Sequence, residues 1–247
     1  MAHRSCRPLV AMGHDGWMRP ITFAHRGGRA DEQENTIPAF RRALEHGASG
    51  LESDARLSAD GEVVLVHDAV ARRGAFRRRR VDQSSAAELA DLGVPRLADL
   101  YTELGSGYEL SLDLYDPPAR IPVLEVAGAA GALERLWVCA AGLDTLTELA
   151  GLGTGAHLVH STRRRAITGS VERHAARLAE HGIAACNMHY TEWTAGLVAL
   201  YHRFGVRAFA WDAQEVRHLR GVLSMAVDGV YSDHVDRMVA TVAEWSE

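Results

Sequence analysis

The sequence predicts an α/β fold, a closed barrel of eight parallel strands with helices between them, in a single domain. Short β-branched or apolar runs alternate with amphipathic helical segments along the chain, which is typical of a mainly parallel sheet. The length of 247 residues is usual for a (β/α)8 barrel. An open sheet would show the same alternation, but eight strands favour closure. The predicted strands are residues 21–25, 50–57, 109–115, 135–139, 156–160, 183–187, 206–211 and 229–232.

Helical periodicity fills most of the intervals between these strands. The amphipathic segments are residues 36–46, 145–149, 170–181, 194–204 and 213–225. Three of them are followed by a glycine that can adopt the left-handed conformation at a helix end, namely Gly47, Gly182 and Gly205. The helices are therefore expected to return the chain from one parallel strand to the next.

The connection after the second strand differs from the others. Residues 58–61 read Ser-Ala-Asp-Gly, and residues 62–67 form a second extended run. Asp-Gly between two extended runs indicates a β-hairpin that returns His67 to the barrel mouth. Residues 68–104 are predicted to be a short insertion over that mouth. Residues 1–20 are predicted to be a poorly ordered leader, and residues 21–247 the barrel domain.

Composition excludes several classes of protein. The formal net charge of −5 argues against a nucleic-acid partner, which usually requires a basic excess. The three cysteines show no zinc-ligand spacing, and no apolar run is long enough to span a bilayer or to form the core of a signal peptide. We therefore expect a cytoplasmic protein without stable membrane insertion. The sequence does not predict the oligomeric state.

Polar residues gather where the predicted strands end, which is where the active sites of such barrels form. The first strand ends in His25-Arg26-Gly27-Gly28. A histidine can transfer protons near neutral pH, an arginine can hold a phosphate through two hydrogen bonds, and glycines let the backbone approach an anion. This end of the first strand is therefore a candidate anion site.

The second and third strands carry acidic residues that are expected to face the barrel interior. Glu52 and Asp54 are two positions apart in one strand and so point the same way, and Asp113 follows in the next strand. Buried carboxylates repel one another unless a cation joins them, and oxygen ligands favour Mg2+ or Ca2+ over zinc. The alternative is a set of ion-paired or surface carboxylates. His67 would bring a second imidazole beside these acids.

Taken together, these residues resemble the glycerophosphodiester phosphodiesterase family, whose barrel belongs to the PLC-like phosphodiesterase type. The similarity is specific between residues 22 and 68. It includes Phe-Ala-His-Arg-Gly-Gly at 23–28, Glu-Asn-Thr at 34–36, Gly-Leu-Glu-Ser-Asp at 50–54 and the segment 60–68 that ends in His-Asp. Looser similarity follows at 207–211, which bears a tryptophan, and at 227–233.

The resemblance implies hydrolysis of a small-molecule glycerophosphodiester to an alcohol and glycerol 3-phosphate, with a divalent cation, Mg2+ or Ca2+. It implies roles for nine residues: acid/base catalysis by His25 and His67, phosphate binding by Arg26, metal binding by Glu52, Asp54 and Asp113, support by Glu34 and Asn35, and an alcohol pocket walled by Trp211.

Two positions depart from the family pattern. Asp113 stands where the family usually has Glu, and this change keeps a hard oxygen ligand. Tyr115 stands where the family usually has a lysine that faces the phosphate. Tyr115 could still bind substrate through a hydrogen bond, but it brings no charge. Arg163–Arg165, after the fifth strand, could replace that charge or be exposed arginines at a helix start.

Two other functions remain open at this point. A lipid phosphodiesterase similar to the sphingomyelinase D barrels would need apolar loops at the mouth, whereas the insertion carries arginines at 72–73 and 77–80. A barrel without catalytic activity that binds a phosphorylated metabolite would explain Tyr115, but it would have no need of two histidines.

Overall fold

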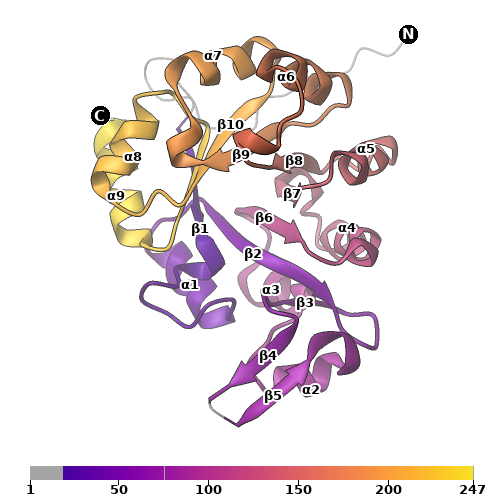
Figure 1. Ribbon diagram of the computed structural model, residues 1–247. Helices are drawn as coiled ribbons and strands as arrows, with labels where there is room; N and C mark the ends of the chain where they lie inside the picture. The colour runs from indigo at the N-terminus through magenta and orange to yellow at the C-terminus, as the bar shows by residue number, and fades with distance from the viewer. Residues whose placement is uncertain (1–18, 75, 247) are drawn as a thin grey trace.

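The computed structural model describes residues 19–74 and 76–246. In this part of the chain eight parallel strands form a closed ring with the helices outside it (Figure 1). β1 pairs with both β2 and β11, which closes the barrel. The predicted (β/α)8 barrel is therefore confirmed. The barrel strands are β1 Ile21–Ala24, β2 Gly50–Leu57, β6 Glu109–Leu114, β7 Leu136–Ala140, β8 His157–Ser161, β9 Ala185–His189, β10 Arg207–Trp211 and β11 Gly229–Ser232.

The helices of the outer ring begin where polar side chains can cap them. Thr36, Ser170 and Thr194 each accept a hydrogen bond from a backbone N–H of the first turn that follows. Of the predicted leader, residues 1–18 lie outside the described residues. No helix among residues 19–74 and 76–246 has the length and apolar character needed to cross a bilayer. The helices are α1 Ile37–Glu45, α3 Leu97–Leu104, α4 Arg120–Ala129, α5 Leu143–Gly151, α6 Val171–Glu180, α7 Ala195–Arg203, α8 Val216–Leu223 and α9 Val235–Trp245.

Alternation along the strands fills the barrel interior in layers. Near the end of the barrel where the strands begin, the Trp137 indole N–H donates to Glu109 over 2.7 Å, and the ring stacks on His157. Above it, Phe23 stacks on Tyr231 with ring centroids 4.6 Å apart. These layers close the lower part of the barrel, and the cavity lies at the opposite end, where the strands terminate.

Close packing in the middle layer requires a glycine at the start of β11. A Cβ at Gly229 would lie 2.8 Å from Cδ1 of Phe209 and 3.3 Å from Cε2 of Phe23, both fully buried rings. We expect Gly229→Ala to lower the free energy of unfolding by about 1–3 kcal/mol, measured by urea denaturation. Gly221→Ala in α8 is the control, because a Cβ there meets nothing within 4 Å; it should be neutral or stabilising. Equal stability of the two variants would contradict this account.

The connection between β2 and β6 contains the predicted hairpin. β3 Val63–Leu65 pairs antiparallel with β2, as the Asp-Gly turn indicated. A second hairpin, β4 Val70–Arg73 with β5 Arg77–Arg80, and α2 Ala86–Ala90 follow. The arginine-rich stretch is thus an exposed hairpin.

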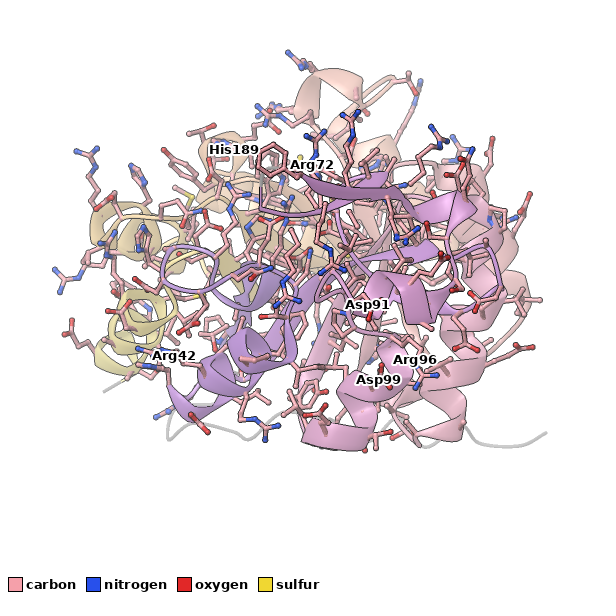
Figure 2. All side chains as sticks on the ribbon, turned by 90° about the horizontal axis from the view of Figure 1, so that it is seen from below. Arg42, Arg72, Asp91, Arg96, Asp99 and His189 are labelled. Atoms are coloured by element: carbon pink, nitrogen blue, oxygen red, sulfur yellow. The ribbon has the colours of Figure 1, made fainter. Side chains whose placement is uncertain are left out.

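The segment predicted to be an insertion, residues 68–104, contains the second hairpin, α2 and α3. Among the described residues of 68–74 and 76–104, no side chain lines the cavity at the barrel mouth. In Figure 1 the second hairpin and α2 lie at the lower edge, across the molecule from α6 and α7. Figure 2 shows Arg72 of β4 toward the same side of the molecule as His189, which ends β9. The hairpin therefore stands beside the mouth, at its rim. Residues 97–104 form α3, which contacts α1 and α4 in the outer ring.

Candidate active site

A cavity of about 640 Å3 opens at the ends of the barrel strands. Interior positions of several strands and the residues that follow them form its wall, as expected for this fold. Its lining contains His25, Arg26, Arg29, Glu52, Asp113, Tyr115, Ser161, Thr162, Arg163, Asn187, Trp211, Asp212, Gln214, Tyr231 and Asp233. Most of the polar residues predicted from the sequence are therefore brought to one place.

Three carboxylates converge at the foot of this cavity. Asp54 of β2 and Asp113 of β6 are direct neighbours in the parallel pairing, and Glu52 lies two residues before Asp54 on the same face. One oxygen from each lies within 4.8 Å of the others. Only 4% of Glu52 and 1% of Asp54 is exposed. The acidic cluster of Glu52, Asp54 and Asp113 is arranged as a group that could hold a metal ion.

The electrostatics of the acidic cluster fit a divalent cation. Burial, and then the charges of Asp54 and Asp113, raise the pKa of Glu52 well above its ordinary value. Burial and the charge of Asp54 raise the pKa of Asp113 to about 7. Both shifts show that three buried negative charges are costly together. A hard cation bound by carboxylate oxygens would remove that cost, so the donor set fits Mg2+ or Ca2+.

Neighbouring side chains hold the acidic cluster in place. The Arg26 backbone N–H donates to Glu52 over 2.9 Å, and the Asn35 amide donates to Asp54 over 2.9 Å. Asn35 is itself fixed by a hydrogen bond from Ser53. Arg26 and Asn35 have positive φ angles of 51° and 55°. Asparagine tolerates this conformation, whereas for Arg26 it is strained, as is often seen at functional sites. Asn35, which the sequence predicts to support the site, thus contacts one member of the acidic cluster.

The Arg26 side chain lies along the edge of the acidic cluster. Its Nε is 3.2 Å from Asp54, close enough for an ion pair although not aligned as a hydrogen bond, and its NH1 donates to Glu34 over 3.1 Å. Glu34 therefore holds the guanidinium from the outside. Arg26 also lines the cavity, where it can reach an anion bound next to the acidic cluster.

His25 is oriented by a residue to which the sequence analysis gave no role. Its Nδ1 lies 2.5 Å from Asp233, and its Nε2 lies 3.8 Å from Glu52. Burial alone would raise the pKa of Asp233, but the hydrogen bond with His25 and the charges of His25 and Arg29 lower it. The signal for Asp233 was its place after the eighth strand: Ala24 pairs with Ser232, so the next residues along the two strands meet.

His67 lies at the rim rather than in the lining of the cavity. Its Nδ1 is 2.8 Å from Asp68, and its ring meets Tyr115 edge-on with centroids 5.2 Å apart. The Arg56 guanidinium lies 4.9 Å from the centre of the Tyr115 ring and pairs with Asp116. Asp116 is thus engaged in an ion pair. Tyr115 contacts His67 and also lines the cavity, so it lies between the two.

The far wall of the cavity is formed by β8, β9 and β10. Trp211 lies on it, and the Arg163 guanidinium lies 5.1 Å from the centre of the indole. Of the arginines at 163–165, only Arg163 lines the cavity. Asn187, which the sequence analysis did not select, also belongs to this wall.

Part of the sequence is similar to a known enzyme family. Residues 25–130 match the model of the glycerophosphoryl diester phosphodiesterase family. A probable glycerophosphodiester phosphodiesterase 1 of Mycobacterium tuberculosis is 37% identical over 103 residues, 42% of this chain. The aligned segment spans 36% of the length of that relative, and 21% of that of a glycerophosphodiester phosphodiesterase from Caldanaerobacter subterraneus.

Solved structures extend the similarity to nearly the whole chain. A glycerophosphodiester phosphodiesterase from Thermotoga maritima superimposes with a TM-score of 0.78 at 25% identity, over 90% of this chain and 97% of that one. An Oleispira antarctica phosphodiesterase shares the fold, with a TM-score of 0.77 at 19% identity over 91% and 97% of the two chains. This chain is therefore similar to glycerophosphoryl diester phosphodiesterases in sequence over residues 25–130 and in fold over nearly its whole length.

Proposed function

We propose that this protein hydrolyses a glycerophosphodiester, with a divalent cation, to an alcohol and glycerol 3-phosphate. The observation that carries the proposal is the position of His25 beside the acidic cluster. Asp233 orients the His25 ring, and its Nε2 lies 3.8 Å from Glu52. The Oleispira antarctica phosphodiesterase was solved in complex with the product sn-glycerol-3-phosphate. We infer the same product here.

The cation and Arg26 would share the phosphate. Glu52, Asp54 and Asp113 would hold Mg2+ or Ca2+, which when bound supplies positive charge to a non-bridging phosphate oxygen. Arg26 would donate to a second oxygen, and Glu34 and Asn35 would keep Arg26 and Asp54 in place. Donors fixed before the reaction stabilise charge that develops in the transition state without reorganising.

The two histidines would move the protons. In the tautomer that donates Nδ1–H to Asp233, His25 has a free lone pair on Nε2, the atom nearer to the acidic cluster. Nε2 can take a proton from an attacking hydroxyl or, once protonated, give one to the departing oxygen. His67, with Nδ1 on Asp68, would do the opposite step from the rim. Each ring has a carboxylate at Nδ1, so either histidine can serve as the base while the other serves as the acid.

Asp233→Asn tests whether the orientation of His25 matters. An amide in place of the carboxylate favours the wrong tautomer, so we expect kcat to fall by about 10²- to 10⁴-fold. Metal affinity should not change, because Asp233 does not belong to the acidic cluster. Asp236→Asn, an exposed acid in the first turn of α9, is the control and should keep full activity. If Asp233→Asn keeps normal kcat, Asp233 does not position a catalytic group.

The central experiment is an assay for glycerol 3-phosphate released from glycerophosphodiesters, with EDTA and then with added Mg2+ or Ca2+. We expect EDTA to abolish release and one of the two ions to restore it. Activity that persists without metal would exclude the proposed site. Tight metal binding without turnover of any diester would favour the non-catalytic barrel. Turnover of lysophospholipids or sphingomyelin alone would favour the lipid phosphodiesterase.

Two further predictions from the sequence are kept as proposals. The formal charge of −5 supports the prediction that the protein has no nucleic-acid partner. We also propose a cytoplasmic location, in keeping with a small water-soluble substrate.

A further inference from the structure

We propose that the wall of the cavity opposite the acidic cluster is a subsite for a hydroxyl-rich alcohol, such as glycerol or inositol, on the leaving side of the diester. We call this wall the polyol wall and define it by Asn187, Arg163 and Trp211. The inference rests on the proposed function and adds the class of alcohol that the enzyme prefers.

The position of the polyol wall follows from the strand order. Around the ring the strands run β1, β2, β6, β7, β8, β9, β10 and β11, so β9 and β10 stand across the barrel from β2 and β6. Asn187 is on β9 and Trp211 is on β10, whereas the acidic cluster is on β2 and β6. A phosphate held at the acidic cluster therefore directs one of its two substituents toward the polyol wall.

Asn187 offers a buried hydrogen-bonding group that the protein itself does not use. Its side chain points into the barrel, in register with Ser161 of β8, and only 5% of the residue is exposed. Its Oδ1 has no hydrogen-bond partner among the described residues. A buried acceptor without a partner is costly, so its place in a cavity wall points to a ligand that donates a hydrogen bond.

Arg163 adds a positive charge beside that acceptor. Its Nε donates to Glu192 over 2.9 Å, and Glu192 also accepts from the Arg164 backbone N–H. Within the described parts of the chain, this is the only hydrogen bond of the Arg163 side chain, so its terminal nitrogens can donate to a ligand. Glu192 thus fixes the direction in which the guanidinium extends over Trp211.

This arrangement selects against cationic alcohols. An aromatic ring often binds a quaternary ammonium through its face, but here the Arg163 guanidinium lies 5.1 Å from the centre of the Trp211 ring. Choline would meet a like charge and would give Asn187 no hydrogen-bond donor. A polyol has hydroxyl groups that can donate to Asn187 and accept from Arg163. The polyol wall therefore fits glycerol or inositol better than choline.

The test compares glycerophosphoinositol and glycerophosphoglycerol with glycerophosphocholine in the same assay for glycerol 3-phosphate. We expect the wild-type protein to prefer the polyol diesters by at least about tenfold in kcat/KM. A polyol hydroxyl would pair with the buried acceptor of Asn187, whereas choline would leave that acceptor without a partner. Asn187→Ala should lower kcat/KM for the polyol diesters by about tenfold and change that for glycerophosphocholine by less than about threefold.

Arg163→Gln is the second variant and should reduce the preference for polyols by about tenfold, since it removes both a charged donor and the repulsion of choline. Arg165→Gln, outside the cavity lining, is its control and should match the wild type. Melting temperatures report whether each variant is folded.

Three outcomes would overturn the inference: equal wild-type kcat/KM for all three diesters, a preference for glycerophosphocholine, or an equal fall for every diester in Asn187→Ala. The last would show that the wall holds the glycerol 3-phosphate half instead. Each of these leaves hydrolysis intact, whereas failure of the proposed function would appear as no glycerol 3-phosphate from any diester.

Discussion

Glu52→Gln is expected to lower turnover of a glycerophosphodiester by about a thousandfold or more. The substitution keeps the shape of the side chain but removes one of three negative ligands, and with it the cation that would stabilise the transition state by several kcal/mol. Hydrolysis is measured as glycerol 3-phosphate released at saturating Mg2+ or Ca2+. Metal binding is measured by calorimetry and should weaken in parallel.

The stability of the Glu52→Gln variant separates a metal ligand from a structural acid. Without metal the variant should melt at the same or a higher temperature than the wild type, because one of three mutually repelling buried charges is gone. Added metal should raise the melting temperature of the wild type and not that of the variant. Glu103→Gln, in an exposed ion pair with Arg41, is the matched control. An active variant that still binds metal tightly would disprove the role of the acidic cluster.

Replacing either histidine is the second large effect. We expect His25→Ala and His67→Ala each to lower kcat by at least about a hundredfold, the contribution of a positioned acid or base. The double variant should lose much less than the product of the two, because proton removal and proton donation serve one reaction. His46→Ala, an exposed histidine at the end of α1, should keep full activity.

Chemical rescue distinguishes catalysis from a structural role of these histidines. Added imidazole can occupy the space left in His25→Ala, beside Asp233, and should restore part of the lost turnover. Metal affinity should stay close to that of the wild type in both variants, since neither ring belongs to the acidic cluster. Near-normal turnover of His25→Ala would end the two-histidine mechanism. Normal turnover of His67→Ala alone would show that another group at the rim makes the proton transfer proposed for His67.

Much of the fold and one half of the site are local properties of the chain. Alternation along a strand is a two-residue repeat, so Glu52 and Asp54 had to share a face, and their burial required that face to be the barrel interior. The same repeat set Asp113 facing inward on β6. The Asp-Gly turn fixed the hairpin of β2 and β3, because turn geometry depends on neighbouring residues.

The other half of the site depends on which strands meet when the ring closes. Asp233 meets His25 across 208 positions because β11 pairs with β1, and no local pattern carries that register. The rim position of the arginine hairpin, the pairing of Arg56 with Asp116 and the open acceptor of Asn187 likewise arise from packing between distant segments. The sequence by itself determined which side chains face the barrel interior. Only the tertiary structure decided which of them lie opposite one another, because that depends on strand order and register around the closed sheet.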